Sequence, residues 1–583
     1  MTKRWIAAFL LLAGCVAIFI LQREKAVVPI TPRPLLYLLA DTQREAERIP
    51  LAITRVSDGR ETEIGDQIAR EYGLTSTPSH DRDARRINAY LSTVGLRVAS
   101  HVRRKAIHYH FYLRDDPNFV NAFALPGGHI VVGRGLLAIM GSEDELAAVL
   151  GHEIVHVDNR HAIERLQYQL ASRRVGLGNL YQFGAPAVEI FEAGYTKEQE
   201  FEADRVGLEL AVAAGYSPMG GVNLMKRFEQ LESNYSEHAT TPIGEFAQVP
   251  FSALAEYFRS HPPAAERREM LEREIKVNDW NAAQRLRPFE IRPIFLSDAA
   301  AKLDSADDFH GAIADLKQAV EVDPHYTRAW RALAQISWRL GDAAGAVQAE
   351  SEVLQQGATD DDWGLLARAL ATSDPRKAVK RLEAFEVENQ PSTVGESLPP
   401  AAVIELDGLR FLQDEKHALV DFQTTLSSLV GVATKASALR EMAWWMCRAG
   451  KLTDAVRQLE EALQIFPQSS RTTLQLVWVL TDLGRQADAK EMLGRIAEDS
   501  PSRKTAAEDQ AARAVVEWRT EERYDARRDF EAAAKDDPAW MVPRWVQNNY
   551  SSTTAGIIAQ LQTSESQRRL KALRQSLQVA TRH

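Results

Sequence analysis

Residues 145–162 read ELAAVLGHEIVHVDNRHA, a stretch in which His152, Glu153 and His156 have the spacing H-E-x-x-H. The chain contains 14 His and 80 Asp plus Glu among its 583 residues. A chain of this composition carries the spacing by chance about 0.05 times. The spacing alone is therefore suggestive, and its interpretation depends on the surrounding sequence.

The surrounding sequence predicts a helix with one buried face. Residues 142–145, SEDE, have the order of a capping box, with Ser142 at the N-cap. Apolar residues then recur at spacings of mostly three and four: Leu146, Val149, Leu150, Ile154 and Val157. Residues four apart share a helix face, so His152 and His156 can bind one metal ion. Glu153 lies about 100° around the axis, where a base beside metal-bound water would sit.

The two histidines leave a catalytic zinc site one ligand short, because such sites usually have three protein ligands and one open position. Residues 195–211, YTKEQEFEADRVGLELA, supply a candidate on a second predicted helix. Glu200 and Asp204 are four apart and share a face, whereas Glu202 points about 200° away from Glu200. Glu200 can complete a His₂Glu site, and Asp204 can orient a ligand imidazole. A solvated acidic face is the alternative.

The region before these helices predicts a small sheet. Residues 106–115 alternate in the manner of a strand, and residues 120–133, VNAFALPGGHIVVG, indicate a strand, a tight turn and a second strand. We expect a mostly helical α+β domain with this sheet beside the H-E-x-x-H helix. Asn121, Ala122 and Phe123 would form an exposed edge strand to which a peptide substrate adds. A purely structural turn is the alternative.

From about residue 300 the pattern changes to Ala-rich helical periodicity with a repeat. In four places an alanine is followed twelve residues later by a proline: Ala312 and Pro324, Ala455 and Pro467, Ala489 and Pro501, Ala526 and Pro538. The steps from 312 to 346 and from 455 to 489 are both 34 residues, the period of tetratricopeptide (TPR) repeats. An all-α TPR solenoid is therefore predicted, with a generic helical array as the alternative.

The N-terminus predicts a targeting segment. Lys3 and Arg4 precede a run of 17 largely apolar residues, Trp5 to Leu21. This pattern is typical of a secretory signal or a short signal anchor. The sequence LAGC, ending at Cys15, also resembles the processing site of bacterial lipoproteins, although the chain stays apolar after it. A buried N-terminal helix is the third possibility. The first two would place the protein in the cell envelope, outside the cytoplasm.

Net charge and cysteine count exclude several classes of partner and site. The net charge of −10 gives no basic surface for nucleic acid, so we expect no nucleic-acid partner. The only cysteines, Cys15 and Cys447, form no disulfide framework and have no zinc-ligand spacing. The predicted organisation is a signal, lipoprotein signal or anchor at 1–25, a linker at 26–60, a metallopeptidase domain at 61–290, a TPR array at 300–545 and a helical tail at 546–583.

Four blocks occur in an order that resembles a family of zinc metallopeptidases: NAFALPGGHIVVGRGLL, EDELAAVLGHEIVHV, EFEAD and SHPPAAER. This family includes HtpX, the CAAX prenyl proteases and BepA-type periplasmic proteases with TPR repeats. The resemblance covers roughly residues 64–267, and the BepA-like layout extends it to most of the chain. It implies a zincin-like domain with one Zn²⁺ per chain.

The resemblance also implies roles for individual residues. The zinc ligands would be His152, His156 and Glu200, with Glu153 as the base and Asp204 as the acid behind a ligand. His261 and Arg267 match the His-Pro-Pro-x-x-x-Arg element of the family, and both are expected to act in catalysis, where the oxyanion needs positive charge or hydrogen-bond donors. His261 would either stabilise the tetrahedral intermediate or cap the zinc, and His238 competes for the capping role. By contrast, His108, His110, His129 and His161 are predicted to be structural or on the surface.

These observations predict a zinc endopeptidase on the periplasmic side of a bacterial envelope, attached to the membrane through its N-terminal segment. Its substrates would be proteins or peptides, and the TPR array would bind a protein partner or present substrate. Proteolytic quality control of envelope proteins is what the resemblance implies. The alternative is a TPR scaffold or chaperone-like adaptor with a latent metallopeptidase domain.

Overall fold

The computed structural model describes residues 56–74, 81–172, 191–192, 194–237, 257, 260–305, 308–372, 375–388, 400–496 and 503–562. The chain divides into two compact units, Met1–Arg292 and Pro293–His583. The predicted N-terminal segment, nearly all of the predicted linker and His238 lie outside the described residues. Within the described part of the chain, no helix has the length and apolar character needed to cross a membrane.

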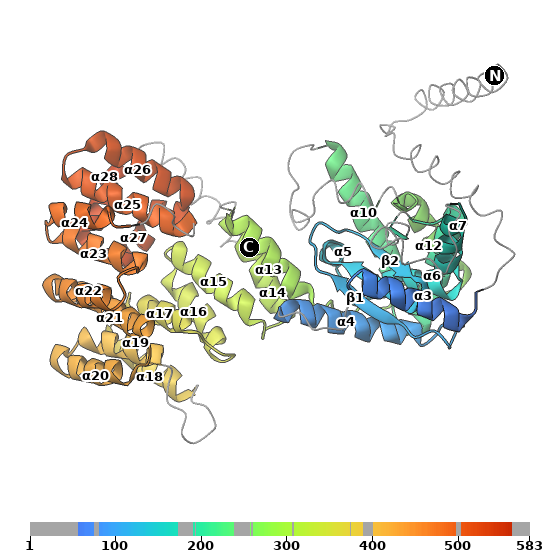
Figure 1. Cartoon of the computed structure of the whole chain (residues 1–583), viewed down its shortest axis with the longest axis horizontal. Helices are drawn as coiled ribbons and strands as arrows, with labels where there is room; N and C mark the ends of the chain where they lie inside the picture. The colour runs from blue at the N-terminus through green and yellow to red at the C-terminus, as the bar shows by residue number, and fades with distance from the viewer. Residues whose placement is uncertain are drawn as a thin grey trace, which may run out of the picture. The chain divides into compact units, whose positions relative to one another are not determined.

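The first unit consists of helices around a small sheet (Figure 1). Its elements, in chain order, are α3 (Asp58–Glu71), α4 (Arg82–Ala99), β1 (His110–Arg114), β2 (Ala122–Leu125), η1 (Pro126–Gly128), β3 (His129–Gly133), α5 (Arg134–Ile139), α6 (Glu143–Asp158), α7 (His161–Ser172), α9 (Lys197–Ala213), α10 (Met219–Glu237) and α12 (Ala264–Val277). The predicted mostly helical domain with a small sheet is confirmed.

The described sheet has three strands in the order β1-β3-β2. β2 and β3 form the predicted hairpin, in which Phe123 pairs with Val131. Their connection turns through Gly127, whose φ of 77° favours glycine over residues with a side chain. β1 runs parallel to β3, a pairing that the sequence pattern did not predict. β2 is an edge strand of this sheet, but all four of its side chains are buried.

Helix α6 is positioned by its N-cap and by a close approach to α9. The Ser142 hydroxyl accepts a hydrogen bond from the amide of Glu145 at 3.2 Å, as the capping sequence predicted. At the crossing, a Cβ on Gly151 would lie 2.4 Å from the carbonyl oxygen of Gly207, and a Cβ on Gly207 would lie 2.5 Å from the amide nitrogen of His152. Two glycines therefore let α9 approach α6 closely beside the first histidine.

The second unit is an array of helix pairs (Figure 1). Its elements are α13 (Arg292–Ser305, which begins at the last residue of the first unit), α14 (Phe309–Val322), α15 (Thr327–Arg339), α16 (Ala343–Leu354), α17 (Asp360–Ala371), α18 (Pro375–Glu388), α19 (Pro400–Phe411), α20 (Glu415–Ser428), α21 (Val432–Arg448), α22 (Leu452–Ile465), α23 (Ser470–Asp482), α24 (Gln486–Leu493), α25 (Arg503–Arg519), α26 (Arg523–Asp536), η4 (Pro538–Met541), α27 (Pro543–Asn549) and α28 (Ser552–Leu561).

The repeat residues occupy the positions that explain the 34-residue period. The repeat alanines are fully buried, where a small side chain lets paired helices approach: Ala312, Ala346, Ala455, Ala489 and Ala526. Pro324, Pro467 and Pro538 each lie two residues beyond the end of a helix, which a proline cannot continue. The predicted TPR solenoid is therefore confirmed.

The last helices close back onto the start of the array. Arg339 at the end of α15 pairs with Asp537, with a 2.6 Å contact, although 198 residues separate them in the chain. Aromatic rings fill the space between the repeats and α27: Trp478, Trp540, Trp545 and Tyr550. α28 packs against α23, α25 and α26. The helical tail predicted from residue 546 thus contains α28. The predicted boundaries between the domains remain predictions.

Glu350 on α16 is a buried acid with no hydrogen bond from its side chain to any residue that the structure describes. Its side chain is fully buried, and neither carboxylate oxygen has a hydrogen-bond partner among the described residues. Burial raises the pKa of Glu350 to about 9, with the Asp362 carboxylate adding to this effect and Arg331 opposing it. The folded chain therefore keeps a proton that the unfolded chain loses above its ordinary pKa of 4.5. The contribution of Glu350 to the free energy of unfolding therefore falls as pH rises through this window.

We expect Glu350→Gln to remove this loss of stability. Relative to the wild type, the variant's free energy of unfolding should rise by as much as about 4 kcal/mol between about pH 5 and about pH 8. Urea unfolding of the full chain at both pH values measures this, with Glu321→Gln on the exposed side of α14 as the control. A difference between variant and wild type that does not change with pH would mean that Glu350 is ionised in the folded chain.

Candidate metal centre

The two histidines of α6 and the first acid of α9 converge. The Nε2 atoms of His152 and His156 are 3.1 Å apart. The Glu200 carboxylate places Oε2 3.6 Å from Nε2 of His152 and Oε1 3.9 Å from Nε2 of His156. All three side chains are buried. The structure therefore brings together the three residues that the sequence predicted as ligands.

Their donor atoms fit one zinc ion. Zinc bonds of about 2.0–2.1 Å in a tetrahedral arrangement separate two ligand atoms by about 3.4 Å. The observed separations lie between 3.1 and 3.9 Å. Burial, followed by the charge of His152, keeps the pKa of His156 well below its ordinary value, so this imidazole is neutral and its nitrogen can act as a ligand. Two imidazoles and a carboxylate are also the donor set of many catalytic zinc sites.

Glu200 is ionised despite its burial. Burial alone would raise its pKa, but the charge and the hydrogen bond of His261, together with the charges of His152 and Arg267, lower the pKa of Glu200 to about 2. A backbone amide also faces it, since the nitrogen of Tyr195 donates to Oε1 at 3.2 Å. The site therefore holds one negative charge opposite the two α6 imidazoles, as a dication site requires.

Asp204 holds the first histidine in place and is itself clamped. Nδ1 of His152 donates to Oδ1 of Asp204 at 2.8 Å, which leaves Nε2 facing the site. The Arg267 guanidinium binds the same carboxylate with two contacts of 2.6 and 2.7 Å, and it also donates to the hydroxyl of Tyr257 at 2.6 Å. Arg267 therefore positions Asp204, while its predicted catalytic role remains a prediction.

His261 contacts the carboxylate of Glu200. Its Nδ1 lies 2.7 Å from Oε2 of Glu200, and its Nε2 lies 3.3 Å from Oδ1 of Asn121. Donor atoms of His152, Glu200 and His261 lie within 4.8 Å of one another, so His261 is also placed to act as a ligand. Both predicted roles of His261, donor to a reaction intermediate or cap on the metal, remain predictions.

Glu153 lies beside the candidate ligands, in the same pocket as His152. Burial is the main reason that its pKa rises to about 7; the charges of Glu200 and Asp204 add to this, while those of His152 and Arg267 oppose it. A carboxylate that binds a proton near neutral pH suits the role of proton acceptor. A bound dication would lower this pKa again.

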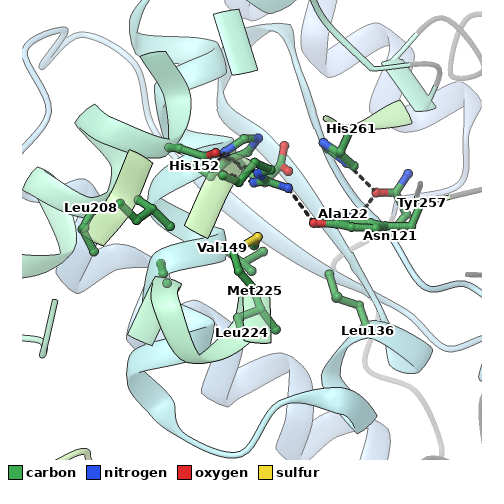
Figure 2. A pocket seen from close by; sticks show the side chains of 16 residues that line it. Asn121, Ala122, Leu136, Val149, His152, Leu208, Leu224, Met225, Tyr257 and His261 are labelled. Carbon is green, nitrogen blue, oxygen red and sulfur yellow. Dashed lines mark hydrogen bonds and ion pairs between the residues drawn. The ribbon is translucent and has the colours of Figure 1, made fainter. Parts of the chain in front are cut away.

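A hollow adjoins these groups. Figure 2 shows His152, His261 and Asn121 along its polar side, while Val149, Leu224 and Met225 line the apolar side together with Leu136 and Leu208. Ala122 also lines the hollow, whereas Phe123 packs into the hydrophobic core beside β3. Of the three residues predicted for the substrate strand, Asn121 and Ala122 therefore face the site and Phe123 does not.

Sequence reasoning missed three neighbours of the site. The ring of Tyr195 stacks on His156 with centroids 3.7 Å apart, and Tyr257 packs against His261 with centroids 4.5 Å apart. His161, predicted to be structural or on the surface, is buried with its Nδ1 3.1 Å from Nδ1 of His156. Arg160 has a φ of 67°, and this reversal of the chain returns His161 to α6. By contrast, His129 pairs with Asp66 at 2.9 Å, as a structural residue would.

Comparison with known proteins agrees with this arrangement. Residues 85–275 match the model described as "Peptidase family M48", and residues 305–371 and 448–513 match a tetratricopeptide repeat model. The chain carries a peptidase M48 domain followed by TPR repeats. The M48 match contains every described residue placed in the candidate metal centre.

Relatives of the M48 domain are distant. "Beta-barrel assembly-enhancing protease" of Escherichia coli (strain K12) is 29% identical over 180 residues, which cover 28% of this chain and 36% of the relative. "Metalloprotease LoiP" of the same strain is 28% identical over 225 residues, covering 36% of this chain and 79% of that protein. "Mitochondrial metalloendopeptidase OMA1" of Arabidopsis thaliana is 32% identical over 158 residues, covering 26% of this chain and 29% of that protein. The chain thus spans about a third of the length of the first of these relatives.

Proposed function

We propose that the chain is a zinc-dependent endopeptidase. His152, His156 and Glu200 would hold one Zn²⁺ per chain, and Glu153 would act as the general base. The observation that carries this proposal is the convergence of two Nε2 atoms and one carboxylate, with separations of 3.1 to 3.9 Å, in a buried site with Glu153 beside it.

The chemistry follows from what each side chain can do. When bound, zinc supplies Lewis-acid chemistry that polarises a peptide carbonyl and lowers the pKa of water. Glu153 takes the proton from the attacking water and passes it to the leaving amine. His261 is the candidate donor to the developing negative charge on the carbonyl oxygen. Asp204 keeps Nε2 of His152 turned toward the site through the 2.8 Å hydrogen bond to Nδ1.

The edge strand β2 provides a way to bind substrate without a strict sequence requirement. As an edge strand of the described sheet, β2 would pair with an extended peptide as a further strand, and the backbone hydrogen bonds would then fix the scissile bond beside the site. Asn121 at the start of this edge lies next to His261, with a 3.3 Å separation between Oδ1 and Nε2. Unfolded or extended protein segments are therefore the proposed substrates.

We further propose that the protein works in a bacterial cell envelope, on the periplasmic side, in the quality control of envelope proteins. The support is the name of the Escherichia coli relative, which refers to β-barrel assembly, and the apolar run at residues 5–21. That run would attach the protein to the membrane, as an uncleaved anchor or through a lipidated Cys15.

The TPR unit is proposed to recruit the substrate or a protein partner. Two adjoining hollows lie within this unit. The side chains that they share are cationic, acidic and aromatic, and they include Arg368, Arg440, Arg471, Asp361, Glu441, Glu508 and Tyr550. Guanidinium groups and large aromatic rings are the side chains that most often anchor protein contacts. All the residues proposed for chemistry lie in the first unit, so recruitment and cleavage belong to separate parts of the chain.

A TPR scaffold with a latent metallopeptidase domain is a second candidate, and the position of His261 favours it. If His261 became a fourth ligand, no coordination position would remain for water, and such closed sites are structural. The contact of 2.7 Å between His261 and Glu200 shows that the imidazole already reaches the ligand cluster.

Metal removal tests the proposal. We expect the chelator-treated full chain to lose cleavage of an unstructured peptide, and one equivalent of Zn²⁺ to restore it, because Glu153 needs an activated water to deprotonate. His261→Ala assayed beside the wild type separates the two candidates. Zinc-loaded wild type that is inactive while His261→Ala cleaves would establish latency, and inactivity of both would overturn the peptidase proposal.

A further inference from the structure

The second histidine of α6 has an unusual neighbour. Nδ1 of His156 lies 3.1 Å from Nδ1 of His161, the first residue of α7. Nε2 of His161 lies 3.4 Å from Oε2 of Glu202 on α9. Both imidazoles are buried, whereas the Glu202 side chain is 42% exposed. A continuous row of polar groups thus runs from the candidate metal centre to the surface.

The protons in this row can be assigned from chemistry. A metal ligand uses the lone pair of one ring nitrogen, so a His156 that binds through Nε2 carries its proton on Nδ1. That proton needs an acceptor, and Nδ1 of His161 is the atom within reach. His161 must then carry its own proton on Nε2, the nitrogen that faces the Glu202 carboxylate. A carboxylate only accepts hydrogen bonds, and it therefore favours this tautomer of His161.

We propose that His161 and Glu202 are positioning residues that fix the ligand tautomer and ring orientation of His156. This inference rests on the proposed zinc site. The two ligand histidines are then held differently: His152 donates directly to Asp204, while His156 donates through a second imidazole to Glu202. The α9 helix supplies both terminal carboxylates, on residues two apart that point to different histidines.

Further contacts orient the groups of this relay, the row formed by His156, His161 and Glu202. Asn159, at the end of α6, donates through Nδ2 to the other Glu202 oxygen at 2.8 Å, which orients the carboxylate. Arg103 in turn donates to Oδ1 of Asn159. On the opposite side, the Tyr195 ring stacks on His156 with an interplanar angle of 13°. The His156 ring therefore has little freedom to rotate away from the site while His161 is in place.

A set of matched variants separates hydrogen bonding from packing. His161→Leu fills a similar space but leaves Nδ1–H of His156 without an acceptor. His161→Asn restores an acceptor, because its carbonyl oxygen can take the position of Nδ1. We expect His161→Leu to lower zinc affinity by about 10- to 100-fold, and His161→Asn to recover most of that loss. Glu202→Leu, at a partly exposed position, should lower affinity several-fold because the tautomer of His161 is no longer fixed.

Competition between the full chain and a chromophoric chelator measures zinc affinity, and the visible spectrum of the Co²⁺-loaded chain reports ligand geometry. Thermal unfolding of the metal-free variants controls for the fold. Wild-type zinc affinity in a folded His161→Leu would overturn the proposal, as would a His161→Asn that loses as much affinity as His161→Leu. If His161→Leu does not fold, unchanged affinity in Glu202→Leu overturns the relay.

His156→Ala distinguishes failure of this inference from failure of the zinc site itself. If His156→Ala binds zinc as the wild type does, the assignment of the metal ligands is wrong. If His156→Ala loses zinc while the His161 and Glu202 variants keep wild-type affinity and Co²⁺ spectra, only the relay is wrong.

Discussion

A Glu153→Gln variant should bind zinc as the wild type does and cleave peptides about 10²- to 10⁴-fold more slowly. The amide keeps the shape of the side chain but cannot accept the proton of the attacking water. Glu153 contributes no atom to the cluster of His152, His156 and Glu200, so the metal should stay bound. Zinc content by elemental analysis and cleavage of a fluorogenic peptide by the same preparation give the two readings.

Glu164→Gln is the matched control, because it makes the same exchange at an exposed position of α7. It should change neither zinc content nor the rate of cleavage. A Glu153→Gln preparation that cleaves at nearly the wild-type rate would refute Glu153 as the base. If the variant is inactive and zinc-loaded, it also serves as a substrate trap, and proteins that copurify with it are candidate substrates.

Glu200→Gln should empty the site. Apparent zinc affinities of about 10–16 kcal/mol in four-ligand sites correspond to roughly 2.5–4 kcal/mol per ligand. Losing the only anionic ligand should therefore weaken binding by about 70- to 900-fold. The neutral amide also removes the charge that faces His152 and His261. Zinc affinity from chelator competition checks this, and cleavage should be lost at limiting zinc.

Glu198→Gln and Glu202→Gln are the controls for this substitution. Glu198 is exposed on the same turn of α9, and its exchange should have no effect on zinc. Glu202→Gln keeps an oxygen that can accept from His161, so its effect should be far smaller than that of Glu200→Gln. A site emptied by Glu202→Gln and filled in Glu200→Gln would show that the wrong α9 acid has been assigned.

The local pattern of the sequence was enough to predict which residues lie on the same face of a helix. Helical geometry fixes that residues four apart share a face, which applies to His152 with His156 and to Glu200 with Asp204. The 34-residue steps and the alanines predicted the TPR array, and the buried positions of Ala312 and Ala455 agree. The targeting segment at residues 1–25 remains a prediction, because it lies outside the described residues.

The neighbours of the site could not be predicted in this way, because they depend on how separate elements pack. Arg267 binds Asp204, and Tyr257 binds Arg267, from beyond α10. The contact of Arg267 with Asp204 depends on the placement of α12 against α9. For the same reason, the sequence indicated a cation at Arg267 near the site but not its partner Asp204. The parallel pairing of β1 with β3 was missed for the same reason.

The sequence by itself therefore determined which side chains each helix presents, since that depends only on the 3.6-residue period of the helix. The tertiary structure alone decided which imidazole nitrogen contacts which carboxylate. The crossing of Gly151 and Gly207 places His152 opposite Asp204, and the reversal at Arg160 places His161 behind His156. Hydrogen bonds act over about 3 Å, so these pairings exist only after distant segments have packed to that accuracy.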